Sequence, residues 1–281
     1  MAIVINTNMA SIKIQHDLNS ATKRMNTAME RMSSGYKINS AKDDPAGYAV
    51  VATMSRTISG VQIAKSNVSM GNDLLSTAEG ALEVVKSNLE RIRDLTEQAA
   101  NGTYSDNDKV GIASEIQARL DQIESISQNT DFNGKKLLDG SMSDGLTLQI
   151  GSEAGQTLSL SSSIFEEIDL SSLDDLTTTI KTGSSSDISN YLATIDTSLN
   201  GIIGRITDVG SASIRLDSVY DTLDVQDTNL QSARSTIRDA DIAEESAEYI
   251  QASILQEAAA ALLVQANNQP QIALQLIIGM W

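Results

Sequence analysis

Apolar residues recur along most of this chain at alternating spacings of three and four, which is the period of one face of an α-helix. The pattern covers residues 14–32, 64–92, 113–123 and 188–223. The second run reads Ala64, Val68, Gly71, Leu75, Ala78, Leu82, Val85, Leu89 and Ile92, and the last reads Ile188, Leu192, Ile195, Leu199, Ile202, Ile206, Val209, Ser213, Leu216, Tyr220 and Leu223. Each stripe needs a facing helix, so we expect a mainly α protein, built as an elongated antiparallel helical bundle or coiled-coil rod.

Residues 141–187 interrupt the helical pattern. Leu146, Leu148 and Ile150 alternate with other residues, and Leu158 and Leu160 do so again after a stretch that contains glycine. This alternation predicts a small β-hairpin region. Acidic residues and many Ser and Thr flank it, so the segment is either a solvent-facing outer surface or only a connection between helices.

Capping signals mark two helix starts. Gly102 is suited to end the helix that contains residues 64–92, and Ser105 to begin the next one, with Asp108 three residues later as a capping-box partner. In the C-terminal half, Asp187 is well placed to cap a helix that begins at Ile188.

The C-terminal segment is apolar on nearly every side. ILQEAAAALLVQA covers residues 254–266, and IALQLIIGMW continues the same character to residue 281. One partner helix cannot cover such a helix, so either a membrane or further copies of the chain must do so. Gln256, Glu257 and Gln265 argue against lipid. We therefore expect self-assembly through both terminal helices, with contact positions Ile14, Leu18, Met25, Met32, Ile250, Ile254, Leu262 and Leu263.

The two ends of the chain carry opposite charge. Residues 1–56 hold seven basic and four acidic side chains, whereas residues 235–281 hold one basic and six acidic side chains. Complementary charge favours an antiparallel pair of terminal helices. Chance asymmetry in an acidic protein is the alternative explanation.

A joint separates the first stripe from the second. Gly35 follows the last turn of the first stripe and suits a helix C-terminal cap. Asp44 precedes Pro45, which restricts Asp44 to the extended conformation of an N-cap residue and itself suits the first position of a helix. We interpret residues 35–44 as a linker between an assembling terminal pair and a self-sufficient rod, although an ordinary interhelical loop would look similar.

Composition excludes several classes of function. The net charge of −17 disfavours nucleic acid and anionic membranes as partners. The chain has no cysteine and a single histidine, His16, so thiol chemistry and multi-histidine metal sites are excluded and we expect no cofactor. His16 lies on an expected assembly helix, and no nucleophile-elbow pattern is present, so we expect no enzyme. The N-terminus lacks a basic region, an adequate apolar core and a cleavage site, so no cleaved secretory signal is expected.

Four segments together carry a family resemblance. RMSSGYKINSAKDDPAGYAV, residues 31–50, resembles the LSSGxRINSAxDDAAG signature of bacterial flagellins. LERIRDLTEQAANGTYSDND, ISQNTDFNGKKLLDG and SILQEAAAALLVQANNQPQIALQLI are similar to the family's other fixed segments, in the same order. The resemblance covers residues 1–140 and 190–278. Pro45 stands where alanine is common, the end is unusually apolar, and variable outer domains are almost absent.

The resemblance implies a subunit of the extracellular flagellar filament, secreted unfolded through the flagellum and polymerised with its own kind for swimming. Residues 1–44 and 239–281 would form an inner tube of terminal helices. The surrounding rod domain would comprise residues 45–140, 141–187 and 188–238. Further implied partners are the flagellar cap and hook-junction proteins, an export chaperone at the C-terminal region, and the innate immune receptor for flagellin, through Arg91, Leu95 and Glu115.

Two alternatives stay open from sequence. A hook–filament junction protein of the same flagellum shares the terminal design and is suggested by Pro45. A membrane-active helical protein would also use an apolar C-terminal helix. Read without the family, Arg91 and Arg93 are charges on a solvated helix face.

Overall fold

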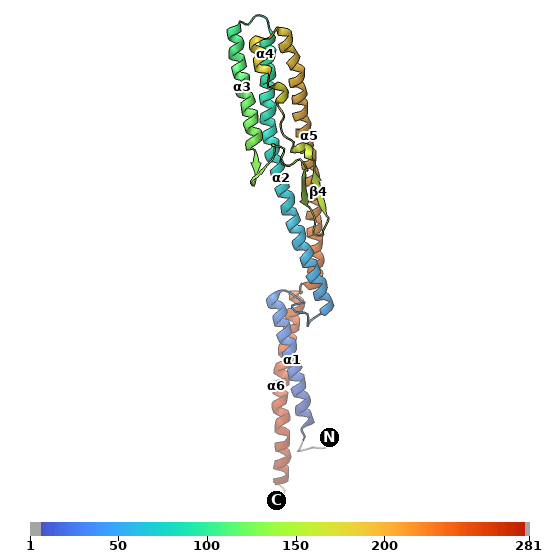
Figure 1. Ribbon diagram of the computed structural model, residues 1–281. Helices are drawn as coiled ribbons and strands as arrows, with labels where there is room; N and C mark the ends of the chain where they lie inside the picture. Colours follow the sequence, from blue (N-terminus) through green and yellow to red (C-terminus); the bar gives the residue numbers. More distant parts are fainter. Residues whose placement is uncertain (1–6, 279–281) are drawn as a thin grey trace. The chain divides into compact units, whose positions relative to one another are not determined.

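The computed structural model describes residues 7–278, and side chains as far as residue 269. The chain divides into two compact units, unit 1 with Met1–Arg56 and Asn229–Trp281, and unit 2 with Thr57–Thr228. Each is built mainly from helices, coloured by sequence in Figure 1. Of the apolar C-terminal end, residues 279–281 lie outside the described residues.

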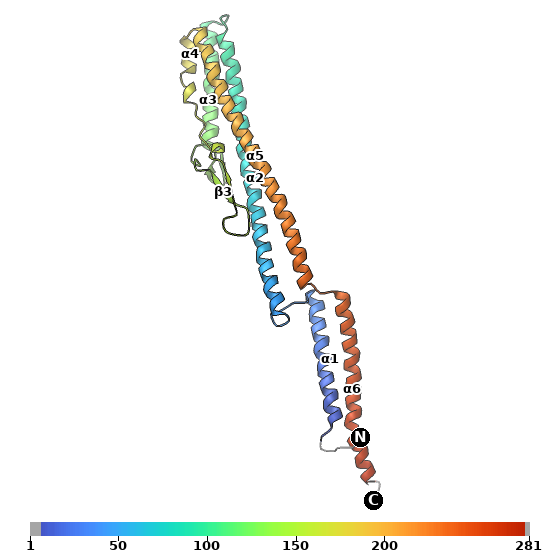
Figure 2. The same cartoon turned by 90° about the vertical axis from the view of Figure 1, so that its right-hand side faces the viewer.

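Unit 1 is an antiparallel helix pair with a junction at one end. Helix α1, Met9–Ser34, lies alongside α6, Ile242–Ile278, and the two run side by side in both views (Figures 1 and 2). The unit also contains the start of α2, Pro45–Ala100, and the end of α5, Ser185–Arg238. The facing stripe expected from sequence is present, because Ala21 and Ala28 are buried and the four larger apolar residues of the α1 run are half-buried.

The core of unit 2 lies between α2, α5 and α3, Asp106–Asn129. All nine positions of the 64–92 stripe are buried, as are Ala113, Ile116, Leu120 and Ile123 of α3. Helix α4, Leu176–Thr182, packs against α3. The mainly α, bundle-like fold class predicted from the period of the apolar residues is therefore correct.

Two small antiparallel hairpins complete unit 2. Strands β3, Leu146–Gln149, and β4, Thr157–Leu160, pair with Leu146 opposite Leu160 and Leu148 opposite Leu158, as the alternation predicts. The sequence pattern did not reveal β1, Asp131–Phe132, and β2, Lys135–Lys136, which join through Asn133 and Gly134. It also did not reveal the two short 3-10 helices, Ser162–Ile164 and Ser171–Leu173, or α4.

The start of α5 corrects one expectation. The helix begins at Ser185, three residues before the predicted start at Ile188, and Asp187 is not its N-cap. The Asp187 carboxylate accepts hydrogen bonds from the backbone N–H and hydroxyl of Ser184, and the Asp187 N–H donates to the Ser184 hydroxyl. Ser184 is the cap and Asp187 its reciprocal partner, the same arrangement that Ser105 and Asp108 make at α3.

One member of the apolar run at residues 188–223 lies outside the core. Tyr220 is 40% exposed, while Leu216 and Leu223 on either side of it are buried. The Lys65 ammonium lies over the Tyr220 ring, 5.1 Å from its centroid. A phenol that keeps one face against a cation has no need of full burial.

Candidate functional site

Alanines bring the two terminal helices of unit 1 together. Ala252, Ala259 and Ala266 of α6 follow one another at intervals of seven, and all are buried, with at most 8% exposure. On α1, Ala21 and Ala28 have the same spacing and are 4% and 1% exposed. A seven-residue interval keeps residues on one face of a helix, and side chains this small permit a close approach of the two backbones.

Charged pairs flank the alanine seam. The Arg24 guanidinium donates from Nε and Nη2 to both carboxylate oxygens of Glu248, at 2.6 and 2.9 Å. Arg31 Nη1 donates to Glu245 Oε1 at 3.0 Å, and the Glu245 residue is only 8% exposed. The hydrogen bond from Arg24, followed by its charge, holds the pKa of Glu248 below its usual value. These pairs join a basic α1 to an acidic α6, which is the charge asymmetry seen in the sequence.

The far end of the pair is joined by neutral groups. Asn8 Nδ2 donates to the Ala266 carbonyl at 2.7 Å, and the Ser11 hydroxyl to Asn267 Oδ1 at 2.8 Å. Together with the arginine pairs, these bonds fix the antiparallel register along the described length of α1.

The apolar positions predicted for assembly separate into two groups. Ile14, Leu18, Met25 and Met32 of α1 are half-buried along the stripe that faces α6. In contrast, Ile250, Ile254 and Leu262 of α6 are 57%, 61% and 56% exposed, and Leu263 is half-buried. Leu255 and Val264, at 42% and 62% exposed, extend the uncovered surface. Unit 1 alone therefore leaves one side of α6 apolar and uncovered.

A groove lies between the two helices on this apolar region. Its volume is about 340 Å³, and its apolar lining comprises Ile14, Ala21, Leu255, Ala258, Ala259 and Leu262. Ala21 and Ala259 of this lining are buried, whereas Leu255 and Leu262 are exposed. The polar residues Asp17, Ser20 and Arg24 complete the lining.

The joint at residues 35–44 is an ordered structure. Gly35 ends α1 in the left-handed conformation, with φ of 73°, and its N–H donates to the Arg31 carbonyl at 2.8 Å. Asp43 accepts hydrogen bonds from the Ser40 N–H and hydroxyl, which lower the pKa of its carboxyl. Asp44 Oδ1 accepts from the Ala46 N–H at 3.0 Å, and α2 begins at Pro45.

Unit 2 brings together the three residues of the receptor resemblance. Arg91 Nε on α2 donates to Glu115 Oε1 on α3 at 3.0 Å, and both side chains are substantially exposed. Leu95, one turn further along α2, is 2% exposed. The exposed surface of this patch is thus an ion pair, and Leu95 lies in the packing beneath it.

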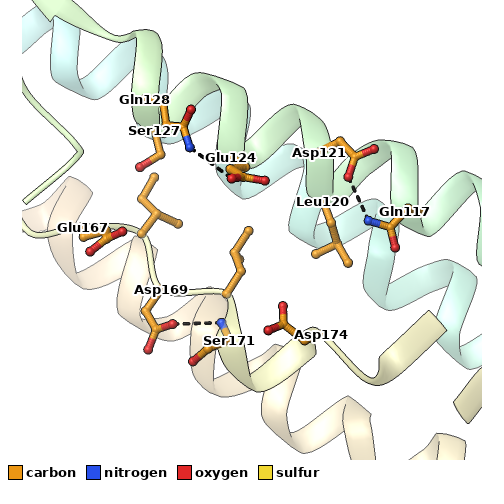
Figure 3. Close-up of a pocket in the computed structure, with 12 residues that line it drawn as sticks. Gln117, Leu120, Asp121, Glu124, Ser127, Gln128, Glu167, Asp169, Ser171 and Asp174 are labelled. Carbon is orange, nitrogen blue, oxygen red and sulfur yellow. Dashed lines mark hydrogen bonds between the residues drawn. The ribbon is translucent and has the colours of Figure 1, made fainter. Parts of the chain in front are cut away.

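A hollow of about 320 Å³ lies between α3 and residues 167–174 (Figure 3). Five carboxylates line it, and three of them accept hydrogen bonds from neighbouring groups. Gln117 donates to Asp121 at 2.8 Å, Gln128 to Glu124 at 3.0 Å, and the Ser171 N–H to Asp169 at 2.8 Å. The bonds from Ser171 lower the pKa of Asp169. Among the described residues no cluster has the makeup of a metal site.

His16 lies on the surface of α1. Its side chain is 86% exposed on α1, with the Asp17 carboxylate 3.8 Å away. Within residues 7–278, no helix has the length and apolar character to cross a bilayer.

Comparison with known proteins explains this arrangement of terminal helices. The model of the bacterial flagellin N-terminal helical region matches residues 5–143, and that of the bacterial flagellin C-terminal helical region matches residues 192–277. The chain belongs to the flagellin family. Flagellins are structural proteins, and this chain is a structural subunit of the bacterial flagellar filament.

Two flagellins are similar to this chain over nearly all of its residues. A flagellin of Halalkalibacterium halodurans is 34% identical, over 98% of this chain and 100% of that protein. A flagellin of Bacillus subtilis is 35% identical, over 97% of this chain and 99% of its own length. Among solved structures, a protein described as a flagellar hook-associated protein from Vibrio parahaemolyticus is 21% identical with a TM-score of 0.63, over 70% of this chain and 100% of that chain. That similarity shows a shared fold, and the hook–filament alternative has less support than the filament subunit.

Sequence reasoning missed the alanine seam in this flagellin. The larger residues of α6 are the more hydrophobic ones, yet most of them are exposed, whereas Ala252, Ala259 and Ala266 are buried. The seven-residue repeat of Ala252, Ala259 and Ala266, preceded by Glu245 at the same interval, was the available signal.

Proposed function

We propose that the uncovered apolar side of α6, with the groove beside α1, is the surface through which subunits polymerise into the filament. Ile250, Ile254 and Leu262 are each more than half exposed and stand on one continuous helix. Burying one such side chain contributes about 1.5–3 kcal/mol. Burial of a few such side chains in every contact between subunits contributes free energy to polymerisation that the lone molecule does not gain.

The seven-residue alanine seam supports different roles for the two sides of α6, one for pairing within the subunit and one for assembly. Small residues and ion pairs hold α1 and α6 together inside one subunit, while larger apolar residues are kept for neighbours. A filament subunit needs this separation, because an intramolecular pair that used every apolar residue would leave nothing for assembly.

Seeded polymerisation of the full-length chain tests the proposal. Ile254→Lys places a charge on the uncovered side, and we expect it to abolish elongation of filament seeds. Val110→Lys is the matched control, since Val110 is 47% exposed on α3, which belongs to unit 2. Both variants should retain the helical circular dichroism of the parent. Normal elongation by Ile254→Lys would overturn the assignment of this surface.

The same surface is our proposal for the other flagellar partners. Hook-junction and cap proteins would meet the terminal helices at the two ends of the filament. An export chaperone would cover the apolar C-terminal region before secretion and assembly. Pull-down of these partners with Ile254→Lys, and with Val110→Lys as the control, distinguishes binding to this surface from binding to unit 2.

A purely structural role, with no enzymatic activity and no cofactor, completes the proposal. The His16 side chain is 86% exposed, and within the described residues it is not hydrogen-bonded to a nucleophilic hydroxyl of the kind that acyl transfer requires. Turnover of an ester or peptide substrate by the purified chain, lost in His16→Ala, would contradict this.

We propose in addition that the Arg91–Glu115 pair contributes to recognition by the innate immune receptor, as the family resemblance implies. Arg91→Ala should weaken signalling in receptor-bearing cells, while Lys86→Ala, which removes another ion-paired cation of α2, should not. Leu95→Ala is a poor probe of contact because Leu95 is buried. Equal signalling by Arg91→Ala and Lys86→Ala would refute the role of Arg91.

A further inference from the structure

The charge of this protein is concentrated in unit 2. Residues 57–228 carry 27 acidic and 11 basic side chains, a net charge of −16, whereas the whole chain has −17. Copies of unit 2 brought together in a polymer therefore repel one another over most of their surface. Contacts between them need faces on which charge is scarce, and two such faces exist.

The first face runs along α2, opposite its buried stripe. Ile63, Met70 and Val84 are 61%, 53% and 46% exposed, and Thr77 occupies the fourth position of the same seven-residue interval. The turns between them present Ser59, Ser66, Asp73, Gly80 and Ser87, so the face carries one charge from residue 59 to 87. We call this face the α2 stripe.

The second face runs along α5, also opposite its buried positions. Ile203, Ile214 and Val225 are 41%, 71% and 61% exposed and follow one another at intervals of eleven. Eleven residues are close to three helical turns, so the three side chains lie in one row. The intervening positions are Thr207, Gly210, Ser218 and Asp221, again with a single charge. We call this face the α5 stripe.

The stripes match in length and differ in shape. Spans of 21 and 22 residues correspond to about 32 and 33 Å of helix. Beside Met70, the α2 stripe has a hollow of about 510 Å³, lined by Ser66, Ser69, Met70, Asp73, Phe132 and Asn133. The α5 stripe presents Ile214, which at 71% is the most exposed of the large apolar side chains described in unit 2.

We propose that the α2 stripe of one subunit packs against the α5 stripe of the next, with Ile214 directed to the hollow beside Met70. Two different faces of one molecule then form the contact, which is a heterologous interface and continues into an open polymer instead of closing as a dimer. The inference rests on the proposed assembly function, but it concerns unit 2 and not the terminal helices. It supplies the second attachment that holds strongly acidic units side by side.

Lysine substitutions test the two faces separately. Ile214→Lys and Met70→Lys should each raise the critical concentration for seeded polymerisation at least about tenfold, because each places a charge in a buried contact. Val110→Lys should stay within about twofold of the parent, since it adds the same charge to an exposed apolar site outside both stripes. Polymerisation of the two stripe variants at the Val110→Lys level would overturn the proposal.

Cross-linking tests the pairing itself, and the absence of cysteine from the chain gives a clean background. Filaments of the double variant Met70→Cys, Ile214→Cys, treated with a short bismaleimide, should give a ladder of covalent multimers on denaturing gels. Each single variant should remain monomeric. Dimers from Ile214→Cys alone, or no ladder from well-formed filaments of the double variant, would overturn the heterologous contact. Failure of the parent chain to polymerise would instead overturn the proposed function as a whole.

Discussion

The Arg238 guanidinium lies over the Tyr36 ring, 3.8 Å from its centroid, and so joins the last residue of α5 to the linker that follows α1. The backbone reinforces this contact. Tyr36 and Asp239 form an antiparallel bridge, the Lys37 N–H donates to the Arg238 carbonyl at 2.6 Å, and the Ala240 N–H donates to the Gly35 carbonyl at 3.0 Å. The two segments of backbone that leave the terminal helix pair are thus hydrogen-bonded to each other.

A double-mutant cycle on this contact measures its strength. Tyr36→Leu and Arg238→Met remove the cation–π interaction and keep much of the apolar bulk. We expect a coupling energy of about 0.5–1 kcal/mol, read from native-state hydrogen exchange of the Lys37 and Ile38 amides. Strictly additive effects of the two substitutions would show that the stacking contributes nothing.

The left-handed backbone at Gly35 predicts opposite results for two glycine substitutions. Gly35→Ala should destabilise unit 1 by about 1–2 kcal/mol, because φ is 73° and alanine disfavours that conformation. Gly80→Ala, in the middle of α2 with open space around the added carbon, should stabilise unit 2 by about 0.5–1 kcal/mol. Chemical denaturation measures both. The same sign for both substitutions would contradict the conformational explanation.

Acid should loosen the terminal helix pair through Glu248. Arg24 lowers the pKa of this carboxyl below its ordinary value of 4.5, so the stabilisation is present above pH 4.5 and is lost as pH falls through the lower, folded-state pKa. Exchange protection of α1 amides should therefore fall on acidification, and less so in Glu248→Gln. Glu257→Gln, on the same helix, is the control and should behave as the parent. An equal response of both variants to acid would remove Glu248 from the explanation.

The β3–β4 hairpin should depend on the glycine that faces it. A carbon added at Gly71 would lie 2.5 Å from Leu148 Cδ1 and 3.3 Å from Leu216 Cδ1. We expect Gly71→Ala to destabilise unit 2 by about 1–3 kcal/mol. In a Leu148→Ala background, Gly71→Ala should destabilise unit 2 less, since the nearer obstacle is then removed. Thermal unfolding of the parent, the two single variants and the double variant measures this coupling. Gly111→Ala, where nothing lies within 4 Å, is the control.

The helices of unit 2 could be predicted from sequence because their period is strong. All nine positions of the predicted stripe between Ala64 and Ile92 are buried. Their burial needs only a facing helix, and the sequence contained one. The capping box of Ser105 and Asp108 was equally visible, because the residue types and their spacing define it. The β1–β2 turn contains an Asn-Gly pair, a residue pair typical of tight hairpin turns, and the φ values of Asn133 and Gly134, 51° and 77°, are both positive.

The orientation of α6 could not be predicted in the same way. A helix that is apolar on nearly every side gives no contrast from which to choose the inner face, so only packing decides it. Ala252 and Ala259 are selected because α1 can approach them closely, and Ile254 and Leu262 are left outside. Similarly, the Ser184 cap was missed because the three serines at residues 184–186 and Asp187 are all candidate caps, and only the hydrogen bonds distinguish them.

Hydrogen exchange of the monomer and of seeded filaments tests the central claim most directly. The claim is that α1 and α6 hold an apolar surface that only other copies of the chain cover. In the monomer, peptides from α1 and α6 should exchange faster than core peptides of α2 near Leu82 and Leu89. In filaments, the α1 and α6 peptides should slow by at least about a hundredfold, while the core peptides change little. Strong protection of α6 in the free monomer, with no further gain on polymerisation, would contradict the account.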